Sequence, residues 1–498
     1  MTIRAPIQLS WLSPCVALAA VCAGTLSGTL SGADAAYPFA MCSNGSILTN
    51  PAYATAMLDA GAHMARVDGS FATVRAKPGD DPAQWNWTAF EGMRTLRQAH
   101  PELDLLPILG YGPEWAEDAR FKDVKGNDPS HPPRGIDVMP VTDPANLYGN
   151  YVFETVKRYK DVIHCWESWN EPDLPGHAFF KGDGHDFLPY QRACYLAAKA
   201  ADPHCTVVFA GLCYASFEGY LATHGLKPPT PYPPTSCFFE EYLEACAKDP
   251  EAAKNHYYFD VLNQHSYSRA SDLYDYVAVL RKLCADHIHS DPTVWITEMG
   301  TPDQPGPFGC APDQYGDYLL QSFAWGSLSH VQRFFHFQLD NSNGHGLYAD
   351  GLGAAKPALT TYRDVLVKEF ASAHFVAQVH GHAGIGFLDG KTPFAGDDHD
   401  GWAAFEFTTE NQRKIIAFAT GDGAVTASIP AKAASAELVD HNGMRTPINA
   451  SGGSYAVALT GSTNLAGWPT IDDPKAKAMG KPEHLVGGAT VIIVETAK

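Results

Sequence analysis

The amino-acid sequence predicts a (β/α)8 barrel followed by an all-β domain, on the basis of three observations. From residue 37 to about residue 370, strand-like apolar runs alternate with amphipathic helical stretches in about eight repeated units. The first strand-to-helix turn, at residues 41–45, lacks the glycine-rich phosphate loop that an open doubly wound sheet carries there. After about residue 370 the pattern changes to short alternating segments separated by Gly, Asp and Asn turns.

The predicted barrel strands are short apolar runs that end in turn residues. They lie at residues 37–42, 63–68, 103–110, 162–169, 206–212, 259–265, 293–297 and 333–339. Amphipathic periodicity predicts helices between them, including residues 89–98, 149–157, 188–201, 273–284 and 314–329. The alternating segments that follow the barrel are residues 402–407, 414–419, 425–429, 436–439, 454–459 and 490–494. We therefore expect a catalytic barrel at 37–370 and an antiparallel β-sandwich at 371–498.

The N-terminal residues have the pattern of a secretory signal peptide. Arg4 precedes a largely apolar stretch at residues 11–26, and an Ala-Asp-Ala sequence at residues 33–35 fits a cleavage site. The alternative is a membrane anchor, but the stretch is short and no basic stop-transfer cluster follows it. The sequence thus predicts cleavage of residues 1–36, a secreted or periplasmic protein, and no membrane association after cleavage.

The net charge limits the possible binding partners, and the number of cysteines limits the possible disulfide pairing. The net charge of −20 argues against nucleic acid and against an anionic membrane surface as partners. Removal of the signal leaves nine of the 11 cysteines, and an odd number implies a free thiol or an intermolecular bridge. Cys165 is the candidate free thiol, because its strand parity places it inside the barrel. Local bridges at 194/205 and 237/246 are open possibilities, and no spacing fits a structural zinc site.

Two glutamates stand at the ends of predicted strands. Glu171 follows the run at residues 162–166, and Glu298 follows the run at residues 293–297. Active-site residues of such barrels lie at the C-terminal ends of the strands. Two carboxylates that face one site are the minimum equipment for cleaving a glycosidic bond. Asn170 and Pro172 flank Glu171, a setting that suits an acid/base carboxyl, so Glu298 is the expected nucleophile.

The motifs around these glutamates carry a family resemblance. The Trp-Asn-Glu-Pro motif that ends at Pro172 and the Ile-Thr-Glu motif that ends at Glu298 resemble those of clan A glycoside hydrolases. The sequence is most similar to family 39, which contains β-xylosidases, α-L-iduronidases and bacterial exopolysaccharide hydrolases. Arg66 fits the strand-two arginine of the clan, and His265 with Tyr267 fits its strand-six His-x-Tyr motif.

The resemblance implies a retaining hydrolase that acts on β-linked oligo- or polysaccharides, with β-xylosides favoured. It implies that Asn170 binds the 2-hydroxyl of the sugar, that Tyr267 orients Glu298, and that Arg66 stabilises the charge of Glu298. No metal and no organic cofactor are implied. Taken alone, His265 also fits a core histidine and Arg66 a structural ion-pair partner.

The sequence departs from the clan on strand eight, where a tryptophan usually lies beneath the sugar. Here the strand reads Arg-Phe-Phe-His-Phe-Gln, so Phe335 and His336 are the candidate replacements. Trp115 follows strand three and is a candidate sugar platform, since aromatic faces suit sugar C–H surfaces. Glu167 lies deeper in strand four and is expected to be a buried structural carboxylate, paired with an arginine.

Two other functions are compatible with this sequence. A non-catalytic carbohydrate-binding barrel usually lacks one catalytic carboxylate, and both are present here. A transglycosylase would use the same two glutamates and differ in how acceptor sugars compete with water.

Overall fold

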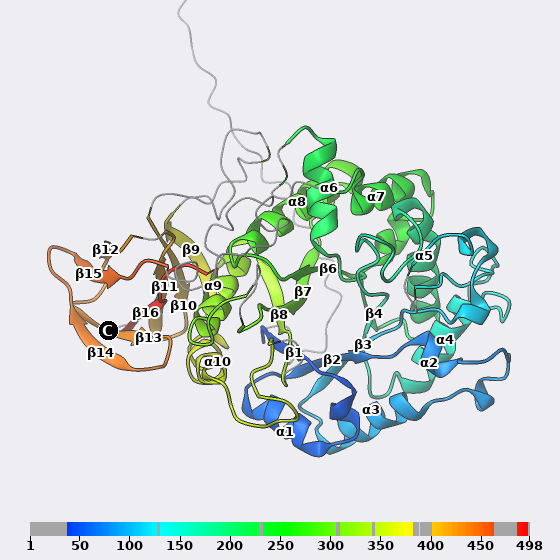
Figure 1. Cartoon of the computed structure of the whole chain (residues 1–498), viewed down its shortest axis with the longest axis horizontal. Helices are drawn as coiled ribbons and strands as arrows, with labels where there is room; N and C mark the ends of the chain where they lie inside the picture. The colour runs from blue at the N-terminus through cyan, green and yellow to red at the C-terminus, as the bar shows by residue number, and fades with distance from the viewer. Residues whose placement is uncertain are drawn as a thin grey trace, which may run out of the picture. The chain divides into compact units, whose positions relative to one another are not determined.

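Eight parallel strands form a closed barrel in the computed structural model of the protein (Figure 1). The structure describes residues 37–126, 130–226, 228, 233–304, 309–340, 344–381, 388, 401–421, 423–462 and 486–496. Each barrel strand pairs with its neighbours in chain order, and β8 closes the ring onto β1. The strands are β1 (Phe39–Cys42), β2 (Met64–Asp68), β3 (Asp104–Ile108), β4 (Cys165–Glu167), β5 (Thr206–Val208), β6 (Val261–Ser266), β7 (Thr293–Met299) and β8 (Val331–His336).

Helices connect the barrel strands and begin at sequence signals typical of helix starts. Asn146 accepts a hydrogen bond from the backbone N–H of Gly149 at the start of α4, and Asp183 and Asp186 form a capping box at the start of α5. The α-helices are α1 (Pro51–Asp59), α2 (Phe71–Val74), α3 (Thr88–Ala99), α4 (Leu147–Tyr159), α5 (Gly184–Ala201), α6 (Tyr214–Thr223), α7 (Phe238–Lys248), α8 (Asp272–Ile288), α9 (Tyr315–Leu328), α10 (Pro357–Thr360) and α11 (Lys368–Phe370). The shorter helical segments are η1 (Gly45–Leu48), η2 (Pro82–Gln84), η3 (Glu114–Ala116), η4 (Ala119–Phe121), η5 (Ala253–Tyr258) and η6 (Thr361–Val367).

The lower part of the barrel interior is filled by apolar side chains from every strand. They form one buried cluster, made of Ala40, Cys42, Met64, Leu106, Cys165, Val208, Val261, Trp295 and Phe335. Because this layer closes the interior, the barrel is a packed core and not a channel. Polar side chains of the same strands lie above it, toward the C-terminal ends.

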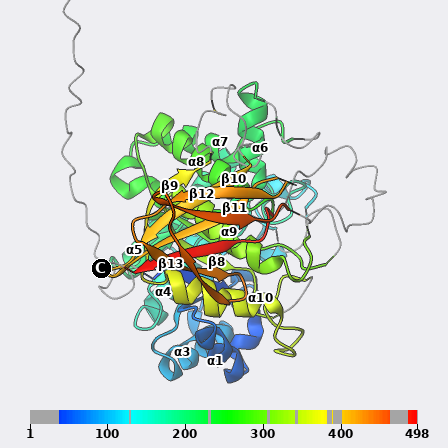
Figure 2. The ribbon, with the colours of Figure 1, turned by 90° about the vertical axis from the view of Figure 1, so that its left-hand side faces the viewer.

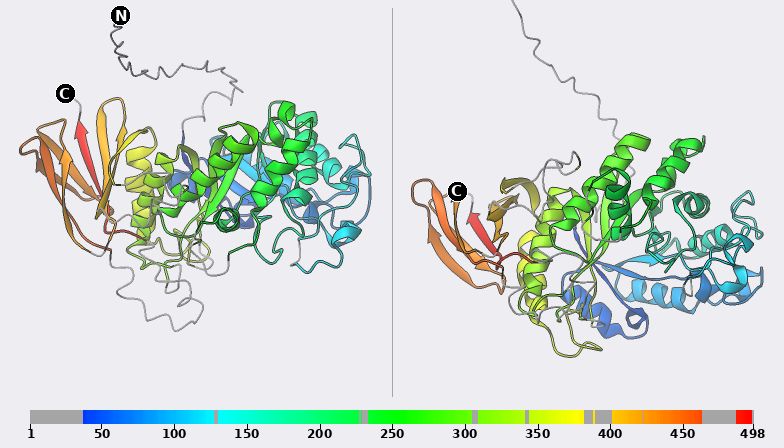
Figure 3. Two further views of the ribbon diagram at one scale, coloured as in Figure 1. Left: turned by 90° about the horizontal axis from the view of Figure 1, so that it is seen from above. Right: turned by 45° about the horizontal axis from the view of Figure 1, so that its top comes forward.

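The C-terminal region consists of two antiparallel sheets (Figures 2 and 3). The larger has six strands in the order β14-β13-β16-β11-β10-β9, and the smaller pairs β12 with β15. A buried cluster that includes Trp402, Ile415, Ile429 and Tyr455 contains side chains of both sheets. The strands are β9 (His374–His380), β10 (Trp402–Thr408), β11 (Gln412–Ala419), β12 (Val425–Pro430), β13 (Ser435–Asp440), β14 (Arg445–Asn449), β15 (Ser454–Leu459) and β16 (Val491–Thr496).

Helix α9 lies between the barrel and the six-stranded sheet. Its Phe323 ring stacks on Phe407 of β10 at a centroid distance of 5.4 Å, and its Trp325 ring meets Phe405 edge-on at 4.9 Å. On the barrel side the Phe323 ring lies 5.2 Å from Phe334 of β8. The apolar core of the barrel therefore continues into the C-terminal sheet.

The predicted fold class is confirmed, with local differences. Strand β4 is shorter than the predicted run at residues 162–169, and β9 and β14 were not predicted. Strand β14 contains Pro447, which lacks a backbone donor and is tolerated because β14 forms the edge of its sheet. The proposed boundary at 370/371 stays a prediction; α11 ends at Phe370 and β9 begins at His374.

All nine described cysteines are buried free thiols, so the possible bridges at 194/205 and 237/246 are not formed. Cys237 instead donates to the carbonyl of Ser216 at 3.1 Å, and Cys165 belongs to the barrel interior, as its parity predicts. The predicted signal peptide, residues 1–36, lies outside the described residues. Among the helices that the structure describes, none combines the length and apolar character needed to cross a membrane.

Candidate active site

Strand β7 places Glu298 at the C-terminal end of the barrel by means of an irregularity in its pairing. Gln264 of β6 pairs with Ile296, but the next residue, His265, pairs with Glu298, so Thr297 is the extra residue of a bulge. A bulge re-aims side chains that strict alternation would send to opposite faces. Thr297 and Glu298 therefore both contact barrel-interior groups, although they are consecutive.

Glu171 reaches the same site from the loop after β4. That strand ends at Glu167, and the chain then pairs Asn170 with Gly211 and donates the Glu171 N–H to the Gly211 carbonyl at 2.8 Å. Glu171 has a positive φ of 38°, a conformation that non-glycine residues adopt rarely. Trp169, two residues before Glu171, packs among the helices against Tyr148 of α4, because the regular strand has already ended.

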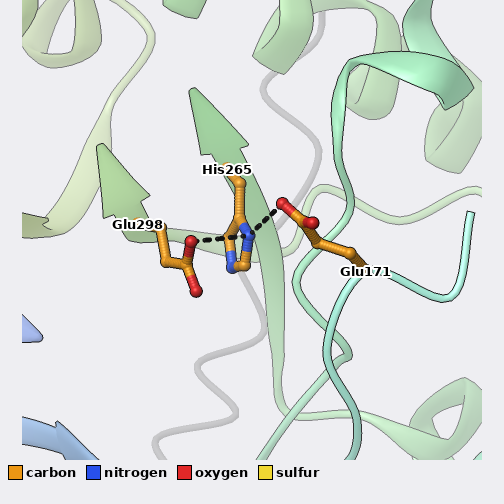
Figure 4. Close-up of side chains that lie close together, drawn as sticks. All are labelled: Glu171, His265 and Glu298. Atoms are coloured by element: carbon orange, nitrogen blue, oxygen red, sulfur yellow. Dashed lines mark hydrogen bonds and ion pairs between the residues drawn. The ribbon is translucent and has the colours of Figure 1, made fainter. Parts of the chain in front are cut away.

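His265 lies between the two glutamates (Figure 4). Its Nδ1 lies 2.9 Å from Oε1 of Glu171 and 3.5 Å from Oε2 of Glu298. One carboxylate oxygen of each glutamate and a ring nitrogen of His265 all lie within 4.8 Å of one another. The two predicted glutamates therefore face each other across a single buried imidazole.

Arg66 connects the nucleophile candidate to the structural carboxylate below it. Its Nε and Nη2 donate to Glu167 at 2.7 and 2.9 Å, Nη2 also donates to Oδ1 of Asn170 at 2.8 Å, and Nη1 donates to Glu298. Glu167 is fully buried and accepts a further bond from Asn263 at 3.0 Å. The expectation that Glu167 is a buried, arginine-paired carboxylate is confirmed.

The surroundings of Glu298 favour its ionised form. Burial raises the pKa of this carboxyl, but the positive charges of His265 and Arg66 and the hydrogen bond from Tyr267 outweigh burial and hold the pKa below its usual range. The hydroxyl of Tyr267 donates to Oε2 of Glu298. Burial and the charge of Glu298 in turn raise the pKa of Tyr267 well above its usual value, so the phenol keeps its proton.

A proton is available in the contact between His265 and Glu171. Thr297 Oγ1 donates to Oδ1 of Asn263 at 2.9 Å, so it accepts from Nε2 of His265, which is 3.0 Å away. With Nε2 protonated, Nδ1 either donates to Glu171 as part of an imidazolium or accepts from a protonated Glu171. Burial lowers the pKa of His265, but the charge of Glu298 and the bond to Glu171 outweigh it, so the pKa is raised.

Two predicted residues lie apart from the glutamates. Trp115, in η3, donates its indole N–H to the carbonyl of Arg75 at 2.9 Å, and guanidinium groups of Arg75 and Arg134 lie 5.4 and 5.6 Å from its ring. Its observed contacts hold the loops after β2 and β3 together. His336 is buried against Tyr315 of α9 and Tyr362 of η6; burial and the nearby His345 lower its pKa to about 3.

The strand-eight aromatic at the site is Phe337, and neither candidate replacement, Phe335 or His336, takes that place. Phe335 lies in the apolar layer at the bottom of the barrel, because it faces inward two residues before Phe337. The Phe337 ring meets Tyr267 edge-on at a centroid distance of 5.7 Å, and His345 lies 5.5 Å from the same tyrosine ring.

Several site residues were missed by the sequence reasoning, and most share a strand face with a predicted one. Asn263 lies two residues before His265, and Asp68 lies two residues after Arg66, so the two-residue period of a strand was a usable signal. Thr297 had no such signal, because the bulge gives it an inward direction that alternation does not predict.

Among the described residues, two groups of side chains have donor atoms close enough to hold a metal ion. One is the site itself, Glu171, His265 and Glu298, and the other is the partly exposed set Asp183, His185 and Glu241. In the first group Arg66 and Tyr267 already engage Glu298. The ion pair with Arg66 and the hydrogen bond from Tyr267 thus already balance the charge of this carboxylate.

A comparison with protein-family models matches part of this chain. Residues 154–362 match the family model described as "Glycosyl hydrolase catalytic core". A sequence search among curated proteins returned no match.

Solved structures share the fold at low sequence identity. A family 39 glycoside hydrolase from the gut symbiont Bacteroides cellulosilyticus WH2 is 14% identical, with a TM-score of 0.60 over 93% of this chain and 82% of that one. A GH30 endoxylanase from Clostridium papyrosolvens C71 is 14% identical, with a TM-score of 0.55 over 93% and 96% of the two chains. A monomeric β-xylosidase from Caulobacter crescentus CB15 is 12% identical, with a TM-score of 0.54 over 93% and 96%.

The barrel and the matched catalytic core together define the class of protein as a glycosidase. The predicted resemblance to glycoside hydrolases is confirmed by the family-model match, and the solved structures that share the fold include family 39 and family 30 enzymes.

Proposed function

We propose that the protein is a retaining β-glycosidase that uses Glu298 as nucleophile and Glu171 as acid/base. The observation that carries the proposal is the separation of the two carboxylates, which have oxygen atoms within 4.8 Å of each other. Retaining glycosidases place their carboxyl groups about 5–5.5 Å apart, whereas inverting enzymes need about 6.5–9.5 Å to admit a water molecule.

The proposed reaction has two displacements. Glu298 attacks the anomeric carbon and forms a glycosyl ester, while the bond to the leaving oxygen breaks and that oxygen takes a proton from Glu171. In the second step Glu171 removes a proton from water, whose oxygen attacks the anomeric carbon and releases Glu298. His265 contacts Glu171 and supports the proton transfers of that carboxyl by holding a proton next to its oxygen atom. Asn170, fixed by Arg66, is placed to bind the sugar 2-hydroxyl.

The electrostatics support this division of roles. The pKa of Glu298 is held below its usual range by His265, Arg66 and Tyr267 against the effect of burial, and a nucleophile must be ionised. Glu171 has a buried histidine as its partner and is not engaged by the arginine. This asymmetry favours Glu298 over Glu171 as the nucleophile.

A saccharide is the proposed substrate, with β-xylosides as the first choice. The solved neighbours named as a β-xylosidase and an endoxylanase support that choice. Export to the periplasm or the medium remains part of the proposal and rests on the N-terminal sequence pattern.

The proposal is tested by covalent trapping. The protein is incubated with activated 2-deoxy-2-fluoro-β-glycosides, with xylose first in the panel, and its intact mass is measured. We expect a mass increase equal to one fluorosugar, located by peptide mapping to Glu298 and absent from Glu298→Gln. A carbohydrate-binding protein gives no adduct with any sugar. A transglycosylase gives the adduct but transfers the sugar to an acceptor in place of water.

A further inference from the structure

Asp68 is a carboxylate at the site that the proposed reaction does not use. It ends β2, two residues after Arg66, so it shares the inward face of that strand and lies nearer its C-terminal end. Desolvation by the surrounding protein and the charges of Glu298 and Glu167 raise the pKa of its carboxyl, against the opposing charge of Arg66. Asp68 also acts on Tyr111, whose pKa burial and the charge of Asp68 raise well above its usual value.

The Asp68 carboxylate is exposed, and no residue that the structure describes donates a hydrogen bond to it. The other three carboxylates of the site all have partners. Glu167 accepts from Arg66 and Asn263, Glu298 accepts from Arg66 and Tyr267, and Glu171 contacts His265. Asp68 is thus the carboxylate whose lone pairs remain open to a ligand that enters the site, and a carboxylate can accept bonds from two neighbouring hydroxyl groups.

The charge balance around Asp68 is negative. Arg66 is the cation that acts on it, and all three nitrogens of that guanidinium already donate to Glu167, Asn170 and Glu298. The two other charged groups that act on Asp68, Glu298 and Glu167, are carboxylates. A sugar that carried its own carboxylate next to Asp68 would meet like charges, and Arg66, the described cation that acts on Asp68, is already engaged by other groups.

We propose that Asp68 is a specificity residue of the sugar site, where it accepts hydrogen bonds from the hydroxyls of a neutral sugar and excludes glycosides of uronic acids. The proposal rests on the proposed function and names the substrate class of the same site. It separates neutral glycosides, such as xylosides, from uronides.

The test compares the binding of two sulfur-linked disaccharides that the enzyme cannot cleave. One is β-thioxylobiose, and the other is its analogue with glucuronic acid at the non-reducing end. Their dissociation constants are measured by titration calorimetry at pH 7 with wild-type protein and with Asp68→Asn. Asp123→Asn is the matched control, because Asp123 is an exposed aspartate in the loop after β3 and undergoes the same chemical change.

We expect the wild type to bind the neutral disaccharide at least about tenfold more tightly than the acidic one. Asp68→Asn is expected to weaken neutral binding roughly tenfold, the loss of a hydrogen bond to a charged group. It should also bring the two dissociation constants within about threefold of each other, since the like-charge repulsion is removed. The control should leave both constants unchanged.

Two results overturn the inference and remain distinct from failure of the proposed function. Equal wild-type affinity for the two disaccharides, or a preference that Asp68→Asn leaves intact, removes the role of Asp68 while covalent trapping at Glu298 still stands. If the wild type binds neither disaccharide and no fluorosugar labels it, the proposed function and this inference fall together.

Discussion

Arg66 sets the geometry of the site, because one guanidinium holds three groups from three parts of the chain. It joins Glu167 at the base, Asn170 in the loop after β4, and Glu298 on β7. Removing one partner of such a buried ion pair by mutation lowers the free energy of unfolding by about 3–5 kcal/mol, since the remaining charge is left buried without a partner. The residue therefore has a structural and an electrostatic role at once, and the two alternatives for Arg66 in the sequence reasoning are not exclusive.

Tyr267 offers a cleaner probe of the charge on Glu298. Its hydroxyl bond helps to lower the pKa of that carboxyl, so Tyr267→Phe should raise it. Glu298, the proposed nucleophile, then ionises only at higher pH, and the acidic limb of the kcat/KM profile should move upward in pH. The lost bond to a charged group should reduce kcat/KM about 10- to 100-fold.

The measurement is a pH–rate profile on an aryl β-xyloside, with Tyr274→Phe as the control on α8. A loss of rate without movement of the acidic limb would mean that Tyr267 only shapes the site.

At the scale of elements, the strands of the barrel were largely predictable and the exact directions of their last residues were not. Apolar runs located every barrel strand, and the resemblance to clan A motifs indicated Arg66 and His265 as site residues. The bulge at Thr297 and the positive φ of Glu171 depend on pairing with β6 and with Gly211, which lie far away in the sequence. Such tertiary pairings determine how close the predicted glutamates lie, and they cannot be predicted from a local sequence pattern.

The junction between α9 and the C-terminal sheet contains a titratable pair. Nδ1 of His441 lies 2.9 Å from both carboxylate oxygens of Asp317, which also accepts from the Thr490 N–H at 2.7 Å. The bond to Asp317 raises the pKa of His441, and burial raises the pKa of Asp317. Both groups bind protons more tightly in the folded state, so the stability they contribute is present at low pH and is lost as the pH rises.

We expect His441→Gln to lower stability most below the ordinary histidine pKa of about 6.5. There the charged pair should contribute about 1–2 kcal/mol, and the difference from wild type should close as the pH rises through the raised pKa of His441. Calorimetric Tm values from pH 5 to pH 9 give the result, with His374→Gln on the exposed start of β9 as the control. A difference in Tm that is constant across this range would exclude the proton linkage.

At the scale of the whole molecule, the described residues are held by burial, since no disulfide joins the cysteines among them. All nine described thiols are buried, and burial raises the pKa of Cys165, for example, to about 11. We expect no reaction of native protein with an aromatic disulfide reagent at pH 7.5 and nine reactive thiols per chain after denaturation, for protein that begins at Tyr37. Intact mass after alkylation counts them. Fewer than nine, restored by a reductant, would show that a bridge forms.

The packing of α9 also limits how this protein can be re-engineered. Its aromatic side chains contact β8 on one side and β10 on the other. Separating the barrel from the C-terminal sheet would therefore expose apolar side chains on both. Sugar-binding modules joined by a linker can be exchanged as cassettes, because few contacts cross the boundary. Here a transplanted sheet would have to pack against the aromatic side chains of α9, a helix of the barrel. We therefore expect most chimaeras that are joined near residue 371 to have a poorly packed core.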